Sequence, residues 1–445
     1  MRIIREFQTA KAVLQRSPFE FGELSIEIGQ MIKRIFGEEL TPEEAVGRII
    51  AEVRTRGDAA LLDYTKRIDG VALTSLETTR EEINEAYGKV DEDLISSLNI
   101  AARRVRSFHQ VQLRHSFREF SEAGLGQIVR PLERVGIYVP GGTACYPSTV
   151  LMSVIPARMA GVKEVIVTTP PGNGEKGEIP PATLVAADIA KVDRVFKVGG
   201  AQAIAALAFG TQSIPKVDKL CGPGGLFVIL AKRMVFGVVD VDGLAGPTET
   251  VILADDSALP PLCAADLLAQ AEHDVLASAI LITTSSRLAQ EVSEEVARQL
   301  EGLERADIAR QSLEERGKII VVADMDQAIE LVNLYAPEHL SLMVRHASSY
   351  MDKISHAGGI FIGESSPEAL GDYVAGPSHV MPTGGSARFS SPLGVSDFLK
   401  LTSVVCLSDE DLESLGAVAA TIARAEGFTA HARAVEARLK KGRKR

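Results

Sequence analysis

Val135-Gly136-Ile137-Tyr138-Val139 is a short β-branched run that leads into the turn Pro140-Gly141-Gly142-Thr143. Similar runs follow at residues 165–167, 194–198 and 217–220, at intervals of ~30 residues that leave room for a helix after each run. Since parallel strands need such crossover connections, the pattern predicts a parallel sheet with helices on its faces.

A second alternating block begins near Glu249. Its expected strands lie at residues 251–253, 279–282, 319–322 and 360–362, and its expected helices at 262–272, 288–300 and 325–334. The first ~120 residues have helical periodicity, and Thr41-Pro42-Glu43-Glu44 is a capping box with proline at the first helical position. We therefore expect an α/β fold: two Rossmann-like parallel-sheet domains with a helical N-terminal segment and an extended C-terminal tail.

These patterns divide the chain of 445 residues into four parts. Residues 1–125 form a helical region expected to pack on the second α/β domain. Residues 126–243 form the first, incomplete Rossmann-like domain, and residues 244–385 form the second α/β domain with the metal and base residues. Residues 386–445 form the tail.

The composition excludes several classes of protein. The net charge is −11, so the chain as a whole is not expected to wrap nucleic acid. The four cysteines are scattered without a CxxC pair, which argues for a reducing compartment and against a thiolate zinc site. No signal peptide opens the sequence and no apolar run is long enough to span a bilayer, so we expect a cytoplasmic protein without a membrane partner.

Tyr335-Ala336-Pro337-Glu338-His339-Leu340 is the stretch with the clearest chemistry. A carboxylate and an imidazole lie side by side, just after a proline, in an apolar setting. Two proton-transfer groups of different pKa on a short turn are what a two-step acid–base reaction needs. This stretch therefore predicts an enzyme with Glu338 and His339 as its catalytic bases.

Glycine turns at residues 140–143, 199–202 and 222–225 indicate a phosphate or dinucleotide site. Glycine lets the backbone approach a ligand, and helix N-termini offer free N–H groups to an anion. However, no GxGxxG follows the first strand, and Thr168 and Thr169 stand where an acidic ribose-binding residue is expected. Any dinucleotide is therefore held in an unusual way.

Nitrogen and oxygen ligands for a metal gather in the second half of the chain. Gln270 and His273 are three residues apart near the end of an expected helix, so they share one face. Asp372 and His379 lie in one loop, and His431 lies in the tail. Taken singly, each is also compatible with an ordinary loop or surface position. Together they suit catalytic zinc, or a harder ion such as manganese.

These motifs resemble those of the histidinol dehydrogenase family over most of the chain. The matching segments are residues 53–61, 138–143, 146–152, 199–207, 270–273, 336–340, 371–373 and 379–383. The resemblance implies oxidation of L-histidinol to L-histidine, the last step of histidine biosynthesis, through bound histidinaldehyde, with two NAD⁺ in succession and one zinc per site.

The resemblance also assigns residues. It implies that the zinc ligands are Gln270, His273, Asp372 and His431. The tail histidine crosses from the partner subunit in this family, so it implies a homodimer with exchanged tails. It places these residues around the substrate: Thr248, Gln270, His273, His339, Asp372, His379, Glu426 and His431. Tyr138, Gln202 and Gly225 fall at cofactor-contacting positions.

Two departures from the family pattern concern binding. Gly225 stands where the family commonly has an asparagine in contact with NAD, so that contact is missing or replaced. Thr248 stands where the family commonly has serine, and it keeps the hydroxyl. Two alternatives stay open: a paralogous NAD- and zinc-dependent dehydrogenase of another small polar alcohol, and a nucleotide- or metal-binding regulatory protein without turnover.

Overall fold

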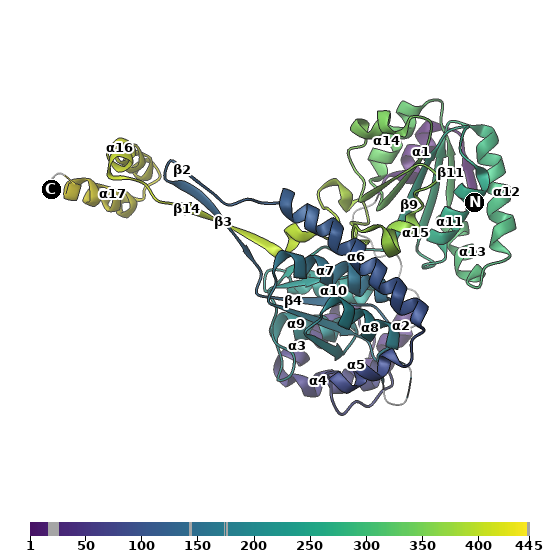
Figure 1. The fold of residues 1–445 in the computed structure, drawn as a ribbon, viewed down its shortest axis with the longest axis horizontal. Helices are drawn as coiled ribbons and strands as arrows, with labels where there is room; N and C mark the ends of the chain where they lie inside the picture. The colour runs from purple at the N-terminus through teal and green to yellow at the C-terminus, as the bar shows by residue number, and fades with distance from the viewer. Residues whose placement is uncertain (17–25, 142–144, 173, 175–176, 443–445) are drawn as a thin grey trace. The chain divides into compact units, whose positions relative to one another are not determined.

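The structure is a computed structural model that describes all residues except 17–25, 142–144, 173, 175–176 and 443–445. The chain divides into two compact units (Figure 1). The larger unit contains Met1–Arg114 and Leu132–Phe398, and the tail unit contains His115–Pro131 and Leu399–Arg445.

The larger unit contains a six-stranded parallel sheet, here called the base sheet, with the strand order β1-β11-β10-β9-β12-β13. Its strands are β1 (Arg2–Ile4), β9 (Glu249–Ala254), β10 (Ser278–Thr283), β11 (Lys318–Val321), β12 (His339–Met343) and β13 (Gly359–Ile362). The helices are α1 (Phe7–Leu14), α11 (Pro260–Ala271), α12 (Ser286–Leu300), α13 (Ala306–Glu315) and α14 (Met325–Tyr335).

Both faces of the base sheet are buried. Along β9, Val251 and Leu253 pack in the cluster that contains α1 and α14, whereas Ile252 and Ala254 pack in the cluster with α11, α12 and α13. Alternate residues of a strand point to opposite faces, so this arrangement explains why the strand reads as a continuous apolar run.

The second sheet of the larger unit, here called the turn sheet, is also parallel, with the order β6-β5-β4-β7-β8. Its strands are β4 (Arg134–Tyr138), β5 (Glu164–Thr169), β6 (Arg194–Lys197), β7 (Lys219–Cys221) and β8 (Asp240–Val241), and its helices are α7 (Pro147–Ala160), α8 (Pro181–Ala190), α9 (Gly200–Phe209) and α10 (Leu226–Val235). Counted from β4, the order is 3-2-1-4-5, a Rossmann order without its sixth strand. The predicted α/β fold with two Rossmann-like sheets is confirmed.

The N-terminal region corrects one expectation. Its helices are α2 (Ile26–Phe36), α3 (Pro42–Arg56), α4 (Asp58–Ile68), α5 (Arg80–Tyr87) and α6 (Glu92–His115), and α3 begins at the expected capping box. Only β1 and α1 join the base sheet. Val46, Ile49 and Val53 of α3 lie in one buried cluster with the alanine-rich α9 of the turn sheet. The small side chains of α9 let α3 approach it closely. Because α3 packs on the turn sheet, residues 1–125 do not pack as a whole on the second α/β domain.

The tail unit combines an antiparallel sheet with a helix pair. The sheet has the order β14-β3-β2, from β2 (Phe120–Glu122), β3 (Leu125–Pro131) and β14 (Leu399–Val405). The helices α16 (Asp409–Ala425) and α17 (Thr429–Gly442) pack on each other at Gly416, where a Cβ atom would lie 2.9 Å from Leu439. The expected tail at 386–445 therefore also takes up residues 115–131, for which the sequence analysis assigned no strands.

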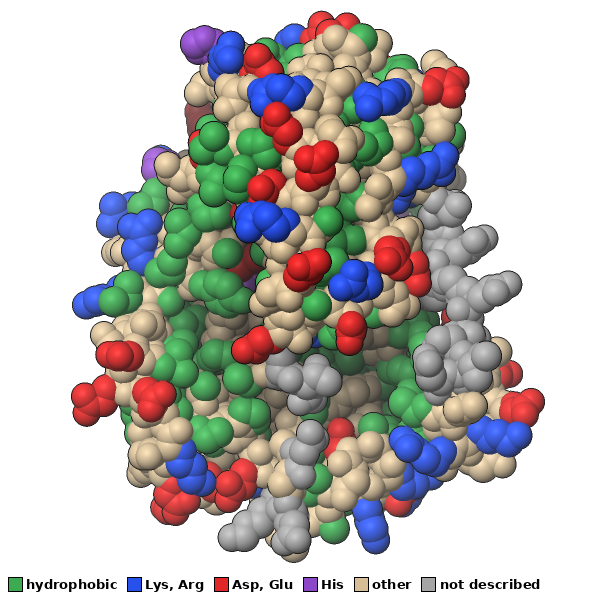
Figure 2. All heavy atoms as spheres, turned by 90° about the vertical axis from the view of Figure 1, so that its right-hand side faces the viewer, with side chains coloured by type: hydrophobic (Ala, Val, Ile, Leu, Met, Phe, Trp, Pro, Cys, Tyr) green, Lys and Arg blue, Asp and Glu red, His purple; other side chains and the backbone are tan. Residues whose placement is uncertain are grey.

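The remaining elements are short: η1 (Ala347–Lys353), α15 (Glu368–Leu370), the π-helical turn η2 (Gly371–Ala375), η3 (Ser386–Arg388) and η4 (Val395–Phe398). Acidic and basic side chains are interspersed over the face drawn in Figure 2. Within the described ranges, no helix combines the length and the apolar content needed to cross a bilayer.

Candidate active site

The expected bases lie at the amino end of β12. Helix α14 ends at Tyr335, Ala336 takes a left-handed conformation with φ 52°, and Pro337 prevents the helix from continuing. The chain then enters β12 at His339, next to Thr250 of β9 in the parallel register. Glu338 and His339 are only 6% and 3% exposed, so both are enclosed by the protein.

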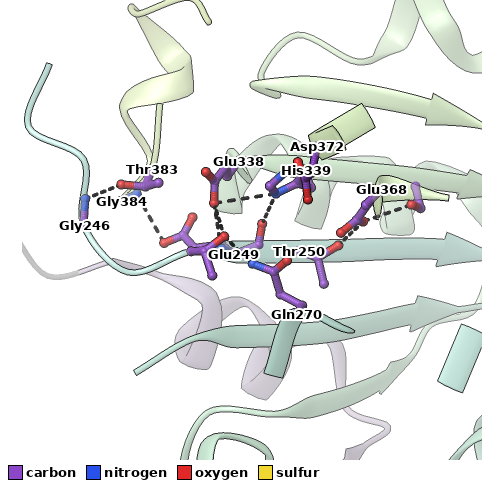
Figure 3. A network of polar contacts seen from close by, with 12 residues as sticks. Gly246, Glu249, Thr250, Gln270, Glu338, His339, Glu368, Asp372, Thr383 and Gly384 are labelled. Carbon is purple, nitrogen blue, oxygen red and sulfur yellow. Dashed lines mark hydrogen bonds and ion pairs between the residues drawn. The ribbon is translucent and has the colours of Figure 1, made fainter. Parts of the chain in front are cut away.

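Glu338 is held by two donors that reach the same oxygen. The hydroxyl of Thr248 donates to Oε2 at 2.6 Å, and the Glu249 backbone N–H donates to Oε2 at 2.9 Å (Figure 3). Burial raises the pKa of Glu338 to about 7, although the neighbouring His339 charge and these two hydrogen bonds act in the opposite direction. The carboxyl is therefore placed to gain and lose a proton near neutral pH.

His339 is fixed through both ring nitrogens. Nδ1 lies 3.2 Å from the backbone oxygen of Glu249, so Nδ1 carries a proton and donates it. Nε2 lies 3.3 Å from Oδ1 of Asp372, and the ring packs against Phe361 at a centroid distance of 5.7 Å. Burial lowers the pKa of His339, but the carboxylates of Glu338 and Asp372 outweigh it and raise this pKa.

The carboxylate of Asp372 interacts electrostatically with three histidines. It lies on η2, and burial by itself would raise its pKa. The hydrogen bond to His339 and the charges of His339, His379 and His273 lower the pKa below its ordinary value. The structure therefore brings His273, His339 and His379 within electrostatic range of Asp372.

His379 spans two parts of the larger unit. Its Nδ1 donates to the backbone oxygen of Asp372 at 2.8 Å, and its Nε2 accepts from the Thr149 hydroxyl of α7 at 3.0 Å. Burial lowers the pKa of His379, which agrees with a neutral ring between a carbonyl and a hydroxyl. This pair links a turn-sheet helix to the loop of the base sheet.

Gln270 and His273 lie at the end of α11. Gln270 is 3% exposed, and its Nε2 donates to the Thr248 hydroxyl, so the amide oxygen is left as its ligand atom. The His273 ring is accessible to solvent, yet the protein around it lowers its pKa, while the charge of Asp372 opposes this shift. The helix end thus presents one amide oxygen and one imidazole.

The donor set suits a metal but is incomplete within the larger unit. Among the described residues, no three His, Cys, Asp or Glu side chains are grouped to hold an ion. The larger unit contributes only two such ligands to the expected set, His273 and Asp372, and Gln270 is an amide. His431 belongs to α17 of the tail unit. Amide oxygen, imidazole and carboxylate nevertheless form a donor set that fits zinc.

Glu426 and His431 are both exposed in the tail unit. Glu426 caps the C-terminus of α16, and the His431 ring packs against Phe428 at a centroid distance of 5.2 Å. Neither belongs to the unit that contains Glu338.

The expected cofactor residues lie at the carboxyl ends of turn-sheet strands. Tyr138 ends β4, and its hydroxyl accepts from the Gly200 N–H at 3.1 Å. Burial raises the pKa of Tyr138 to about 12. Gln202 is fully buried in α9, and both polar atoms of its amide lack a hydrogen-bond partner among the described residues. Gly225 is the N-cap of α10, with open space where a Cβ would stand.

The model of the family described as histidinol dehydrogenase matches residues 36–439. The chain belongs to the histidinol dehydrogenase family. The histidinol dehydrogenase of Dehalococcoides mccartyi is 51% identical over 440 residues, with 99% of this chain and 100% of the relative covered. That of Deinococcus radiodurans is 51% identical over 436 residues, with 97% and 98% covered. The crystal structure of the Elizabethkingia anophelis histidinol dehydrogenase has a TM-score of 0.90 at 35% identity, with 99% of this chain and 98% of that chain covered.

Family membership confirms the resemblance and the prediction of a dehydrogenase, and it removes the regulatory protein without turnover as an alternative. The sequence analysis missed three residues that lie at the candidate active site. Glu249 binds both bases through its backbone, Glu368 accepts from the Thr250 and Ser341 hydroxyls and acts electrostatically on His339, and Thr149 donates to His379. Thr149 lies inside a quoted motif and Glu249 at the start of the second alternating block, but no neighbouring residue in the sequence indicates their partners.

Proposed function

We propose that this chain oxidises L-histidinol to L-histidine through bound histidinaldehyde, with two NAD⁺ and one zinc per site, as the last step of histidine biosynthesis. The observation that carries the proposal is the enclosed Glu338–His339 pair beside Asp372, Gln270 and His379 in a histidinol dehydrogenase.

In the first oxidation, His339 is the base. Nδ1 is committed to the Glu249 carbonyl, so Nε2 is the nitrogen left to take the alcohol proton; it is free to do so when Asp372, to which Nε2 donates here at 3.3 Å, binds the metal instead. The hydride leaves the same carbon for the first NAD⁺, and histidinaldehyde stays bound.

In the second oxidation, Glu338 activates water. Both hydrogen bonds to this carboxyl end at Oε2, so we assign Oε1 as the atom that takes the water proton. The water oxygen adds to the aldehyde carbon while His339, protonated in the first oxidation, returns its proton to the carbonyl oxygen; this gives a hydrate and a neutral His339. His339 then takes a hydroxyl proton from the hydrate while the hydride leaves for the second NAD⁺, which yields the carboxylic acid.

For the metal, we assign Gln270, His273 and Asp372 from one chain and His431 from a second copy. Bound zinc would orient the substrate amine and imidazole and stabilise developing charge. Thr248, His339, His379 and Glu426 complete the substrate contacts in this proposal.

For NAD⁺, we assign Tyr138, Gln202 and the turn at residues 222–225. The unpartnered amide of Gln202 supports this assignment, because a buried amide without a hydrogen bond is costly and a ligand can satisfy it. Gly225 offers backbone only, so we expect weak contact there.

A homodimer with exchanged tails is supported by the surface of the tail unit. Leu415, Val418 and Ile422 lie on one side of α16 and are each more than half exposed. An exposed apolar stripe next to Glu426 and His431 suits burial against a second copy of the chain. A reducing, cytoplasmic setting is supported by the four free cysteines.

The test is a substrate panel with NAD⁺, in which NADH absorbance is followed. Histidinol should yield two NADH per molecule, chelation should abolish turnover, and added zinc should restore it. If a diol or another small polar alcohol is oxidised and histidinol is not, the paralogous dehydrogenase is the correct assignment. Full turnover of protein shown to be free of metal would refute the zinc requirement.

A further inference from the structure

Arg16 binds two segments that carry the bases. Its Nη1 and Nη2 donate to the two carboxylate oxygens of Glu249 at 2.5 and 2.6 Å. Its Nε donates to the backbone oxygen of Tyr335 at 2.8 Å, and the guanidinium lies 3.9 Å from the centroid of the Tyr335 ring. One side chain near the N-terminus thus clamps β9 to the end of α14.

Glu249 transmits this clamp to both bases through its backbone. Its N–H donates to Oε2 of Glu338 at 2.9 Å, and its carbonyl accepts from Nδ1 of His339 at 3.2 Å. Its side chain also accepts from the Gly384 N–H at 3.2 Å, at the left of the network in Figure 3. Any movement of the Glu249 backbone therefore shifts one hydrogen bond of Glu338 and one of His339.

Tyr335 connects Arg16 to Glu338 through the turn between α14 and β12. Two residues separate Tyr335 from Glu338, and the first of them, Ala336, has the left-handed φ of 52°, which a non-glycine residue adopts only where its surroundings hold it. The bond from Arg16 fixes the first carbonyl of this turn.

We propose that Arg16 is a positioning residue that holds Glu338 and His339 in their reactive geometry. The Glu249 side chain is 8% exposed, so without Arg16 its charge is enclosed and unpaired, and the segment must shift to find solvent or another donor. A misplacement of about 1 Å at a reacting group costs ~10²-fold in rate. The expected loss of kcat rests on the proposed function. The expected movement of the segments that carry Glu338 and His339 does not.

Arg194 provides a matched control. It donates to both carboxylate oxygens of Glu77 at 2.8 and 2.6 Å and to the Ser213 carbonyl at 2.9 Å, and it lies 4.8 Å from the Phe196 ring centroid. The side chains of Arg16 and Arg194 are 24% and 30% exposed. Arg194 thus makes the same kinds of contact in the turn sheet, but its partners, Glu77 and Ser213, do not bind Glu338 or His339.

The experiment compares Arg16→Gln, Arg16→Lys and Arg194→Gln in the full-length enzyme. We expect Arg16→Gln to lower kcat for both oxidations ~10- to 100-fold with KM for histidinol changed less than about threefold, Arg16→Lys to recover part of the loss, and Arg194→Gln to stay within about twofold. The melting temperature should fall more in Arg16→Gln than in Arg194→Gln, because the Glu249 side chain is 8% exposed and the Glu77 side chain 38%. Equal kcat in the two Gln variants would overturn the inference.

Hydrogen exchange separates this inference from the proposed function. In Arg16→Gln, the amides of Glu249, Ala336 and residues 338–341 should exchange faster than in Arg194→Gln, whether or not histidinol is the substrate. If wild-type protein does not oxidise histidinol, the proposed function fails, and the exchange data alone decide the role of Arg16. Unchanged exchange at these amides would contradict it.

Discussion

The Thr248 hydroxyl donates to Oε2 of Glu338 at 2.6 Å and accepts from Nε2 of Gln270. A position that the family pattern assigns to substrate binding therefore also connects a base to an expected metal ligand. Serine at this position can make the same two bonds, so the extra methyl of Thr248 does not remove this link.

Thr248→Val should damage the second oxidation, and Thr248→Ser should not. Loss of a hydrogen bond to a charged group costs ~1.5–3 kcal/mol. The lost donor stabilises the carboxylate, so the pKa of Glu338 should rise further in Thr248→Val, and the acidic limb of histidinaldehyde oxidation should move to higher pH. The measurement is the pH profile of kcat with histidinaldehyde. An unshifted limb would show that the hydroxyl serves the substrate alone.

Glu338→Gln should separate the two oxidations. The amide keeps the shape and can still accept from Thr248 and Glu249, but it cannot take a proton from water. We expect histidinaldehyde oxidation to fall ~10²–10⁴-fold and histidinol oxidation to fall much less. Single-turnover assays with each substrate measure this. Equal losses in both steps would contradict the separate roles of Glu338 and His339.

Gly225→Asn should strengthen NAD⁺ binding without loss of stability. A Cβ at Gly225 meets no atom within 4 Å, φ is −71°, and asparagine is a favourable N-cap for α10. We expect a lower KM for NAD⁺ and an unchanged KM for histidinol. Gly222→Ala is the contrasting variant, because its φ is +110° and its Cβ would lie 2.0 Å from the Tyr138 carbonyl. A higher KM for NAD⁺ in Gly225→Asn would show that the open space itself is needed.

The buried carboxyl of Asp69 should make stability depend on pH. Its Oδ2 lacks a partner among the described residues, and burial raises its pKa to about 6. A folded-state pKa above the unfolded value gives a stabilisation that is present at low pH and lost as pH rises through about 6. The free energy of unfolding of Asp69→Asn relative to wild type should therefore increase by ~1–3 kcal/mol between pH ~4 and ~7. Urea unfolding at several pH values tests this, and a pH-independent difference would contradict it.

The sequence predicted side-chain identities better than positions. Gln270, His273, Glu338 and Asp372 stand in recognisable motifs, whereas the register that sets His339 beside Thr250 depends on how distant strands pair. The bases lie at the amino end of β12, while the glycine turns at residues 199–202 and 222–225 lie at the carboxyl ends of β6 and β7. No local pattern indicates which end of a strand a ligand uses.

The tail sheet was missed for another physical reason. Phe120–Glu122 is exposed at every residue, so β2 has no apolar alternation to predict a strand. The packing of α3 on α9 likewise depends on tertiary complementarity, since an amphipathic stripe indicates that a helix is buried but not against which sheet.

Tail exchange predicts complementation between two inactive variants. If His431 serves the site of a second copy, a mixed dimer of Glu338→Gln and His431→Asn chains has one site with both defects and one site with neither. Random assembly makes half of the dimers mixed, so co-refolded protein should recover about a quarter of the wild-type rate of histidinaldehyde oxidation, a step for which each variant alone is inactive. If each tail served its own chain, every site would carry one defect and the mixture would show no recovery. Activity measured against the mixing ratio decides between these arrangements, because only exchange gives a maximum at equal amounts.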